Sequence, residues 1–92
     1  MADNLSNARE RARCDLAKRL GVAESEIKED KVERAEFPDA SLGAPIDGEM
    51  SAQMISNGHR ILLSHKDKGY EYRTSGTVLR LYKFKGDNRR VD

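Results

Sequence analysis

The sequence predicts an α+β fold in which an N-terminal amphipathic helix packs on one face of a mainly antiparallel β-sheet, a meander of hairpins. Two patterns predict these elements: apolar residues recur at helical spacing before residue 21, and they alternate between short turn signals after residue 49. A chain of 92 residues builds one hydrophobic core. We therefore expect a single domain over residues 1–84. Because apolar periodicity ends there, we expect a flexible C-terminal tail over residues 85–92.

The helix is marked by an apolar stripe and by a stop signal. The stripe is spaced at three or four residues and consists of Leu5, Ala8, Ala12, Leu16 and Leu20. Gly21 follows at the position where a left-handed C-terminal cap is favoured, and Val22 can pack back onto the last turn. The helix is therefore expected to end at residue 20.

Two polar segments follow the helix. Residues 27–37 lack helical periodicity and carry few apolar side chains, which predicts a polar edge strand. Residues 38–48 contain both prolines of the chain and two of its glycines, which predicts a long loop. Loops of this length in small domains are usually functional or fold as compact surface loops.

Three two-residue turns are predicted for the hairpins, at Asn57-Gly58, Asp67-Lys68 and Ser75-Gly76. They place Met54 opposite Ile61, Leu63 opposite Tyr72, and Tyr72 opposite Leu79. One sheet face then collects the apolar residues Met50, Ala52, Met54, Ile61, Leu63, Tyr70, Tyr72, Leu79 and Leu81. The other face is mixed and collects Gln53, Ile55, Arg60, Leu62, Glu71, Arg73, Val78, Arg80 and Tyr82.

The net charge of +1 conceals an acidic segment over residues 24–49 and a basic one from residue 50 onward. The two segments could attract one another within the fold or between copies, or the basic one could bind nucleic acid. No apolar run approaches membrane-spanning length, and the first residues carry neither a basic stretch nor an apolar one. With a single cysteine, Cys14, in the chain, we expect a cytoplasmic location.

The candidate catalytic and metal-binding groups do not combine into a site. His59 and His65 are six residues apart on one predicted strand, so about 20 Å separates them and they cannot share a metal. Cys14 has arginines nearby but no nucleophile signature. Ser41 lacks the nucleophile-elbow context. Three carboxylates in or directly after the loop could bind a cation, but their spacing matches no calcium-binding loop; they are Asp39, Asp47 and Glu49. We therefore predict no enzyme activity, cofactor or metal.

The mixed sheet face offers two binding hypotheses. Arg60, Arg73 and Arg80 beside Tyr82 could follow a phosphate backbone and stack bases, as in single-stranded nucleic-acid binding. Glu71, predicted opposite Arg80, instead indicates an ordinary cross-strand ion pair. Apolar residues among these arginines are compatible with a protein-binding surface; they are Ile55, Leu62 and Val78.

The loop and strands also carry a family pattern. It reads Phe37-Pro38-Asp39-Ala40-Ser41-Leu42-Gly43-Ala44-Pro45, Gly48, Ala52-Gln53, Gly58-His59-Arg60-Ile61 and Tyr70-Glu71-Tyr72-Arg73-Thr74. This pattern resembles a family of small bacterial domains whose function is not settled, over about Leu5 to Phe84. The helix and tyrosine-rich strands are also similar to PepSY-type domains, which are associated with peptidase inhibition or protein binding. If the loop binds a partner in relatives, the resemblance implies that Asp39, Ser41, Leu42 and Gly43 do so here.

Together these observations predict a non-enzymatic protein-interaction domain, and the resemblance to PepSY-type domains implies an inhibitor or a binding module. Single-stranded nucleic-acid binding through the basic sheet face is the alternative. The predicted binding residues are Asp39, Ser41, Leu42, Gly43, Arg60, Arg73 and Arg80. Another protein is the expected partner, and no membrane contact is expected. A monomer or a weak homodimer is expected, because the polar strand leaves an edge that a second copy could pair with, although its charges argue against pairing.

Overall fold

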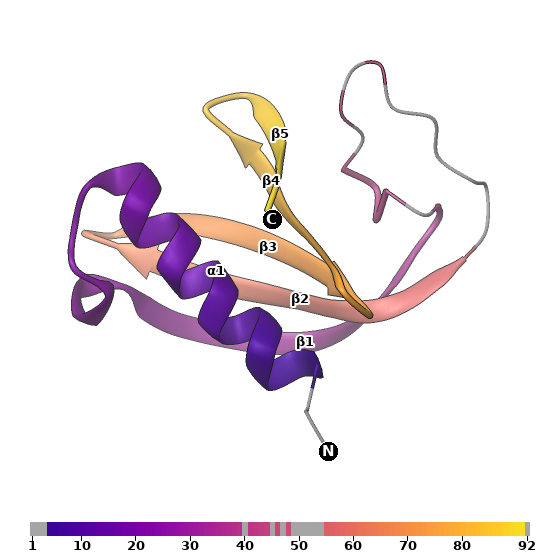
Figure 1. Cartoon of the computed structure of the whole chain (residues 1–92), viewed down its shortest axis with the longest axis horizontal. Helices are drawn as coiled ribbons and strands as arrows, with labels where there is room; N and C mark the ends of the chain where they lie inside the picture. The colour runs from indigo at the N-terminus through magenta and orange to yellow at the C-terminus, as the bar shows by residue number, and fades with distance from the viewer. Residues whose placement is uncertain (1–3, 40, 45, 47, 49–54, 92) are drawn as a thin grey trace.

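A computed structural model describes residues 4–39, 41–44, 46, 48 and 55–91, and in it one helix lies across a five-stranded antiparallel sheet (Figure 1). Its elements are α1 (Asn4–Leu20), the short 3₁₀ helix η1 (Glu24–Glu26), β1 (Lys28–Phe37), β2 (Ser56–His65), β3 (Lys68–Ser75), β4 (Val78–Phe84) and β5 (Asp87–Arg90). Neighbours in the chain are neighbours in the sheet, in the order β1-β2-β3-β4-β5. The predicted α+β meander is therefore confirmed.

The helix ends as the sequence predicts. Gly21 has a φ of 70°, and its N–H donates to the carbonyl of Lys18. The N–H of Val22 donates to the carbonyl of Ala17 at 3.0 Å. These two bonds form the glycine-terminated cap that satisfies the last helical carbonyls. Val22 packs against the core, so the cap also turns the chain toward β1.

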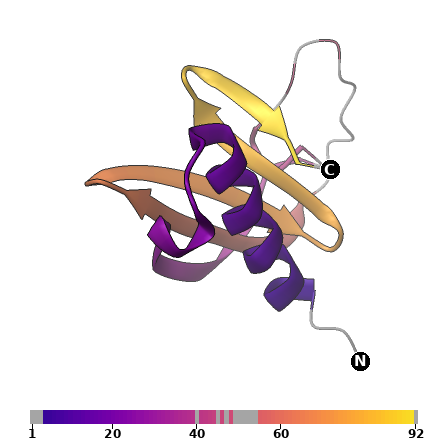
Figure 2. The ribbon, with the colours of Figure 1, turned by 60° about the vertical axis from the view of Figure 1, so that its left-hand side comes forward.

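The main core lies between α1 and one face of the sheet, called here the front face. Figure 2 shows the helix in front of this face, with the β4–β5 hairpin bent up beside it. The helix contributes its predicted apolar stripe, and the strands contribute alternate residues. The buried members are Ala8, Ala12, Leu16, Ala17, Ile27, Ile61, Leu63, Tyr72, Leu79, Leu81, Phe84 and Val91.

A polar network joins the helix to the front face. The hydroxyl of Tyr72 donates to the Asp15 carboxylate at 2.7 Å, and Arg19 binds the same carboxylate oxygen at 2.6 Å. Burial, followed by the hydrogen bond with Asp15, raises the pKa of Tyr72 well above its ordinary value. The Tyr72 hydroxyl therefore remains neutral and donates a hydrogen bond to Asp15 of the helix.

The polar edge strand predicted over residues 27–37 is confirmed as β1, which pairs with β2 from Lys28 to Phe37. The turn predicted at Asn57-Gly58 is wrong, because both residues lie inside β2. A Cβ atom on Gly58 would stand 1.9 Å from the Thr74 carbonyl oxygen. The glycine is required because two strands approach closely there, a use of glycine that differs from a turn. The predicted partner of Ile61, Met54, lies outside the described residues.

The other two turns are each displaced by one residue from their predicted positions. Lys66 and Asp67 form the β2–β3 turn with φ values of 50° and 66°, and Gly76-Thr77 connects Ser75 to Val78. Each cross-strand partner therefore moves by two residues, and Tyr72 pairs with Ile61 and Leu81. Because side chains alternate with a period of two, the predicted faces of β2, β3 and β4 survive this shift. Ile55 was predicted on the mixed face through the turn at Asn57-Gly58, and no strand pairing in the described part of the chain places it there. Met50, Ala52, Gln53 and Met54 of the predicted faces lie outside the described residues.

The C-terminal segment differs from the flexible tail predicted over residues 85–92. Asp87–Arg90 form β5, and the following Val91 is 7% exposed in the main core. Arg11 of the helix donates to the carbonyl of Val91 at 3.1 Å, and the N–H of Val91 donates to the carbonyl of Leu79. A four-residue strand with one apolar residue at its end has too short a pattern for periodicity to reveal.

Candidate interaction surface

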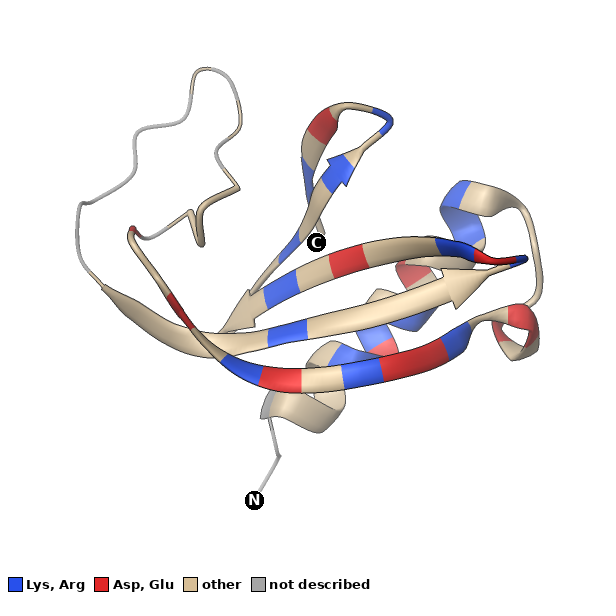
Figure 3. Ribbon diagram, turned by 180° about the vertical axis from the view of Figure 1, so that it is seen from behind, with Lys and Arg blue, Asp and Glu red and all other residues tan. Residues whose placement is uncertain are grey.

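The mixed face of the sheet lies opposite α1 and is called here the back face. Its described residues on the three central strands include Arg60, Leu62, Glu71, Arg73, Arg80 and Tyr82. Figure 3 shows this face from behind, with bands of both charge signs across the strands. The loop lies beside the end of the sheet where β1 ends and β2 begins.

The first part of the loop is folded around one carboxylate oxygen. Oδ1 of Asp39 accepts hydrogen bonds from the Ser41 hydroxyl at 2.6 Å, the Ser41 N–H at 3.0 Å and the Gly43 N–H at 3.1 Å. The hydroxyl of Ser41, followed by the N–H of Gly43, lowers the pKa of Asp39 below its ordinary value. Two backbone bonds close the same turns, from Leu42 to Asp39 and from Ala44 to Ser41. We call Asp39 and residues 41–44 the loop cover.

Apolar and small residues fix the loop cover against the protein. Ser41, Leu42 and Ala44 are buried, as is Phe37 at the end of β1. These residues do not belong to the main core under α1. The domain therefore has a second, smaller buried cluster on the side of the sheet that the helix does not cover.

Arg73 connects the loop cover to the sheet. Its Nη1 donates to the Leu42 carbonyl at 3.0 Å, and its Nε donates to the Glu71 carboxylate at 2.6 Å. The guanidinium carbon lies 3.7 Å from the centre of the Tyr82 ring. A guanidinium held by an ion pair, a carbonyl and an aromatic face has one geometry and little remaining rotational freedom. The Arg73 side chain is only 13% exposed. Its main role is therefore to hold the loop cover in place, and little of it can contact a partner.

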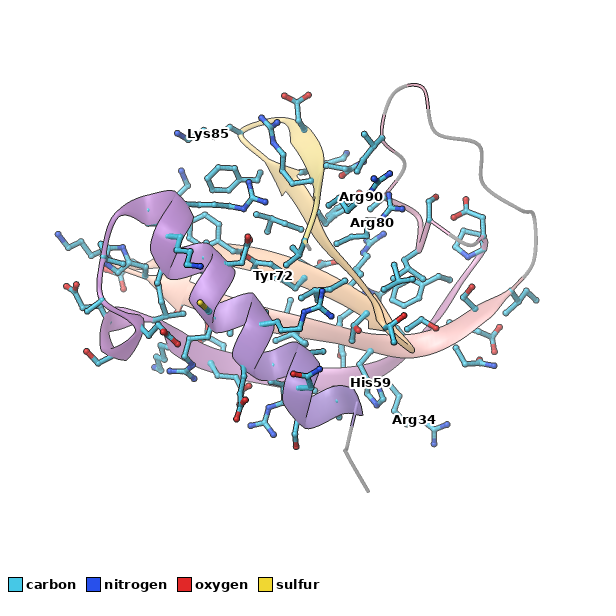
Figure 4. The ribbon with its side chains drawn as sticks, in the orientation of Figure 1. Arg34, His59, Tyr72, Arg80, Lys85 and Arg90 are labelled. Atoms are coloured by element: carbon cyan, nitrogen blue, oxygen red, sulfur yellow. The ribbon has the colours of Figure 1, made fainter. Side chains whose placement is uncertain are left out.

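Arg80 makes a parallel connection one strand further along. It is 7% exposed, and its Nη1 donates to the Ala44 carbonyl at 3.3 Å. Figure 4 labels Arg80 among the side chains between β4 and the loop. Two arginines from neighbouring strands thus bind two carbonyls of the same loop, Leu42 and Ala44.

Gly43 has a steric reason to be a glycine. Its φ is 67°, in the left-handed region, and a Cβ atom there would stand 2.8 Å from Nη1 of Arg73. A side chain would therefore strain the backbone and displace the guanidinium. The glycine allows Arg73 to reach the carbonyl of Leu42.

Arg60 is the predicted arginine that solvent reaches most easily. Its side chain is 37% exposed, against 13% for Arg73. Carboxylates of Glu33 and Glu71 each lie 3.7 Å from its guanidinium, and the Phe37 ring centre lies 5.8 Å away. Its charge is therefore balanced by acidic neighbours.

The structure thus brings the seven predicted residues into one region and divides their roles. Asp39, Ser41, Leu42 and Gly43 form the loop cover, Arg73 and Arg80 hold it, and Arg60 faces solvent.

The cross-strand ion pair predicted between Glu71 and Arg80 is wrong, because Glu71 lies opposite Tyr82 and binds Arg73. The two-residue register shift causes this difference. Sequence reasoning also missed the contact between loop carbonyls and arginines. The Asp-x-Ser-x-Gly spacing from Asp39 to Gly43 signals the turn, but it does not indicate which side chains donate hydrogen bonds to the turn's carbonyls.

Among the described residues, the candidate catalytic and metal-binding side chains do not form a cluster. His59 lies in β2 directly opposite Arg34 in β1, and Figure 4 labels both. Cys14 is a free, partly exposed thiol on α1. The described part of the chain contains no group of three or more His, Cys, Asp and Glu that could hold a metal ion. Asp47 and Glu49, two of the three carboxylates in and beside the loop, lie outside the described residues.

The fold and the back face define a small α+β domain with one sheet face under a helix and the loop cover packed against part of the other. Residues 9–81 match a family described as Domain of unknown function (DUF8738), and the chain belongs to this family. No curated protein and no solved structure matches the chain. Within the described residues, none of the helices has the length and apolar character needed to cross a membrane.

Proposed function

We propose that this domain is a non-enzymatic protein-interaction module that binds its partner on the back face, beside the loop cover. The observation that supports this proposal most strongly is the fixed geometry of Arg73, between Glu71, the Leu42 carbonyl and the ring of Tyr82. A surface that is already ordered loses less side-chain freedom on binding, which favours association.

The composition of the back face also favours a protein partner. Arginine and tyrosine are enriched where protein interfaces concentrate their binding energy. Arg60 is accessible, Leu62 is half-buried on the same face, and Val78, opposite Ser75, is an apolar residue that is 37% exposed. A protein surface that combines uncharged polar and apolar groups would match this face, because its arginines already have acidic neighbours or loop carbonyls as partners.

Single-stranded nucleic acid remains the alternative, but the charges favour it less. Phosphate binding depends on basic side chains that can neutralise phosphates. Arg60 lies within 3.7 Å of two carboxylates, those of Glu33 and Glu71, and Glu71 also binds Arg73. A partner phosphate would have to compete with these carboxylates.

The resemblance to PepSY-type domains refines the proposal. Under this refinement the partner is a peptidase or another protein that the domain inhibits or binds, in the cytoplasm. The single cysteine of the chain, Cys14, is compatible with that compartment.

Capture of partners by a pair of charge-matched variants tests the proposal. Arg60→Ala removes one positive charge from the back face, and Lys18→Ala removes one from the exposed surface of α1. We expect wild type and Lys18→Ala to retain the same protein from native lysate. Arg60→Ala should bind it about tenfold more weakly when affinity is measured with the purified partner.

Two results would contradict the proposal. The first is that no protein is retained by wild type, or that Arg60→Ala retains it as well as Lys18→Ala does. The second is salt-sensitive binding of labelled single-stranded oligonucleotides that Arg60→Ala weakens, which would support the alternative.

A further inference from the structure

The outer edge of β1 is a second surface with a specific chemistry. β1 is ten residues long and stands at one end of the sheet order, so within the described residues it has a strand neighbour on one side, β2. An edge strand of this length offers unpaired backbone N–H and carbonyl groups to another strand. Its side chains decide which strand fits.

The charges of β1 are reversed in sign about its centre, Val32. In antiparallel self-pairing about Val32, residues at equal distances from it stand opposite each other. This places Lys31 opposite Glu33. The outer pairs are Asp30 with Arg34 and Lys28 with Glu36. Each of the three pairs brings opposite charges together, and because the two copies are related by a two-fold axis, each pair occurs twice in the dimer. Figure 3 shows this alternation of blue and red along β1.

Neighbouring registers lack this match. Moving the partner strand by one residue places Asp30 opposite Glu33, or Lys31 opposite Arg34. Moving it by two residues places Lys31 opposite its own copy, or Glu33 opposite its own copy. Like charges directly opposite one another are destabilising, so the charge pattern selects the register centred on Val32.

Protection of an edge against self-association would give a different pattern. A strand that resists pairing with its own copy through charge repulsion places like charges opposite one another. In β1 the charges that would face each other attract. Val32 supports the same conclusion, because it is half-buried against the core and its remaining apolar surface would meet its copy.

One local irregularity limits the paired region. The β1–β2 register shifts between Glu29 and Lys31, so Asp30 is a bulged residue. Regular pairing is therefore expected around Lys31, Val32 and Glu33, with the outer pairs less tightly held.

We propose that two copies of this chain pair antiparallel through their β1 edges about a two-fold axis at Val32. The two five-stranded sheets then form one continuous sheet with a self-complementary interface. The back face of each copy remains open, so the dimer is independent of the proposed protein-binding function.

Charge reversal and exchange at Asp30 and Arg34 test the dimer. Both side chains are exposed, and their reversal leaves the core untouched. Arg34→Asp places Asp opposite Asp30, whereas the double variant Asp30→Arg/Arg34→Asp restores opposite charges with the signs exchanged. Lys66→Asp is the matched control: it makes the same charge change away from the edge, at a turn position with positive φ that Asp tolerates.

Sedimentation equilibrium over a wide range of protein concentration at low salt gives the readout, with circular dichroism as a check of folding. We expect wild type, Lys66→Asp and the double variant to approach the mass of a dimer as concentration rises. Arg34→Asp should dimerise only at higher concentration than wild type, and added salt should weaken the wild-type dimer. A wild type that stays monomeric at every concentration, or a dimer that Arg34→Asp leaves intact, would overturn the proposal.

Discussion

The two faces of one sheet are covered in different ways. On the front face, α1 contributes apolar residues such as Leu16, which is fully buried against the strands. On the back face, the loop cover is held by Arg73 and Arg80, which donate to its carbonyls. The same strands supply both faces, because alternate side chains point to opposite sides.

Because the two faces are held by different interactions, we expect them to contribute differently to the stability of the domain and to the shape of its surface. Burial of apolar surface contributes free energy in proportion to area and depends little on direction. Charge-assisted hydrogen bonds and guanidinium stacking contribute less through area but fix orientation. The front face should therefore determine whether the domain is folded, and the back face should determine the shape that a partner meets.

Leu16→Ala should give the largest effect, because it removes a fully buried side chain from the front face. The expected loss in the free energy of unfolding is about 2–5 kcal/mol, measured by urea denaturation. Lys18→Ala, two residues away on the exposed side of the helix, is the control and should change stability little. A loss below about 1 kcal/mol for Leu16→Ala would show that the helix is not a main source of stability.

Tyr72→Phe should give an intermediate effect, of about 1–2 kcal/mol, because it deletes the hydroxyl that binds Asp15 at 2.7 Å. It should also change the pH dependence of stability. The pKa of Tyr72 is raised in the folded state, so its contribution is complete below about pH 10 and decreases as pH rises above that value.

Unfolding of wild type and Tyr72→Phe at neutral pH and above pH 10 checks this prediction. The stability difference between the two proteins should shrink at high pH, because the ionised tyrosine favours the unfolded chain. A difference that stays constant across that range would mean that the hydroxyl titrates normally.

Asp39→Asn should give the smallest loss, about 0.5–1 kcal/mol, since it removes the charge from the oxygen around which the loop cover is folded. The pKa of Asp39 is lowered in the folded state. Its contribution is therefore complete above the ordinary aspartate pKa, near 4, and is lost as pH falls through the folded value.

Urea unfolding at neutral pH and below pH 4 should show a gap between wild type and Asp39→Asn that closes at acid pH. Asp67→Asn, in an exposed turn, is the control. An equal change in both variants would indicate a general charge effect and not a property of the loop cover.

Much of the fold could be predicted because its signals are periodic. The helical stripe and Gly21 give the helix and its end, and the two-residue alternation gives the faces of the sheet even when each turn moves by one residue. Gly58 and β5 could not be predicted. The first is fixed by a neighbouring strand that local sequence does not identify, and the second is too short to show a period.

The candidate site was predictable as a set of residues but not as an arrangement. The sequence separates the loop, with Asp39 and Gly43, from the strand arginines by about thirty residues. Their contact depends on which loop carbonyls lie over which strand, and that follows from tertiary packing. The close approach of Arg73 to Gly43 explains the glycine only once both are placed.

Amide hydrogen exchange in Arg73→Gln tests most directly whether this arginine fixes the loop cover on the back face. The Gly43 N–H, bound to Asp39, and the Ala44 N–H, bound to Ser41, report on the loop, and Leu16 in α1 reports on the front face. Arg60→Gln is the control for lost charge. We predict exchange about tenfold faster at Gly43 and Ala44 in Arg73→Gln alone, with Leu16 much less affected. Unchanged loop amides, or an equal increase at Leu16, would contradict the separate roles of the two faces.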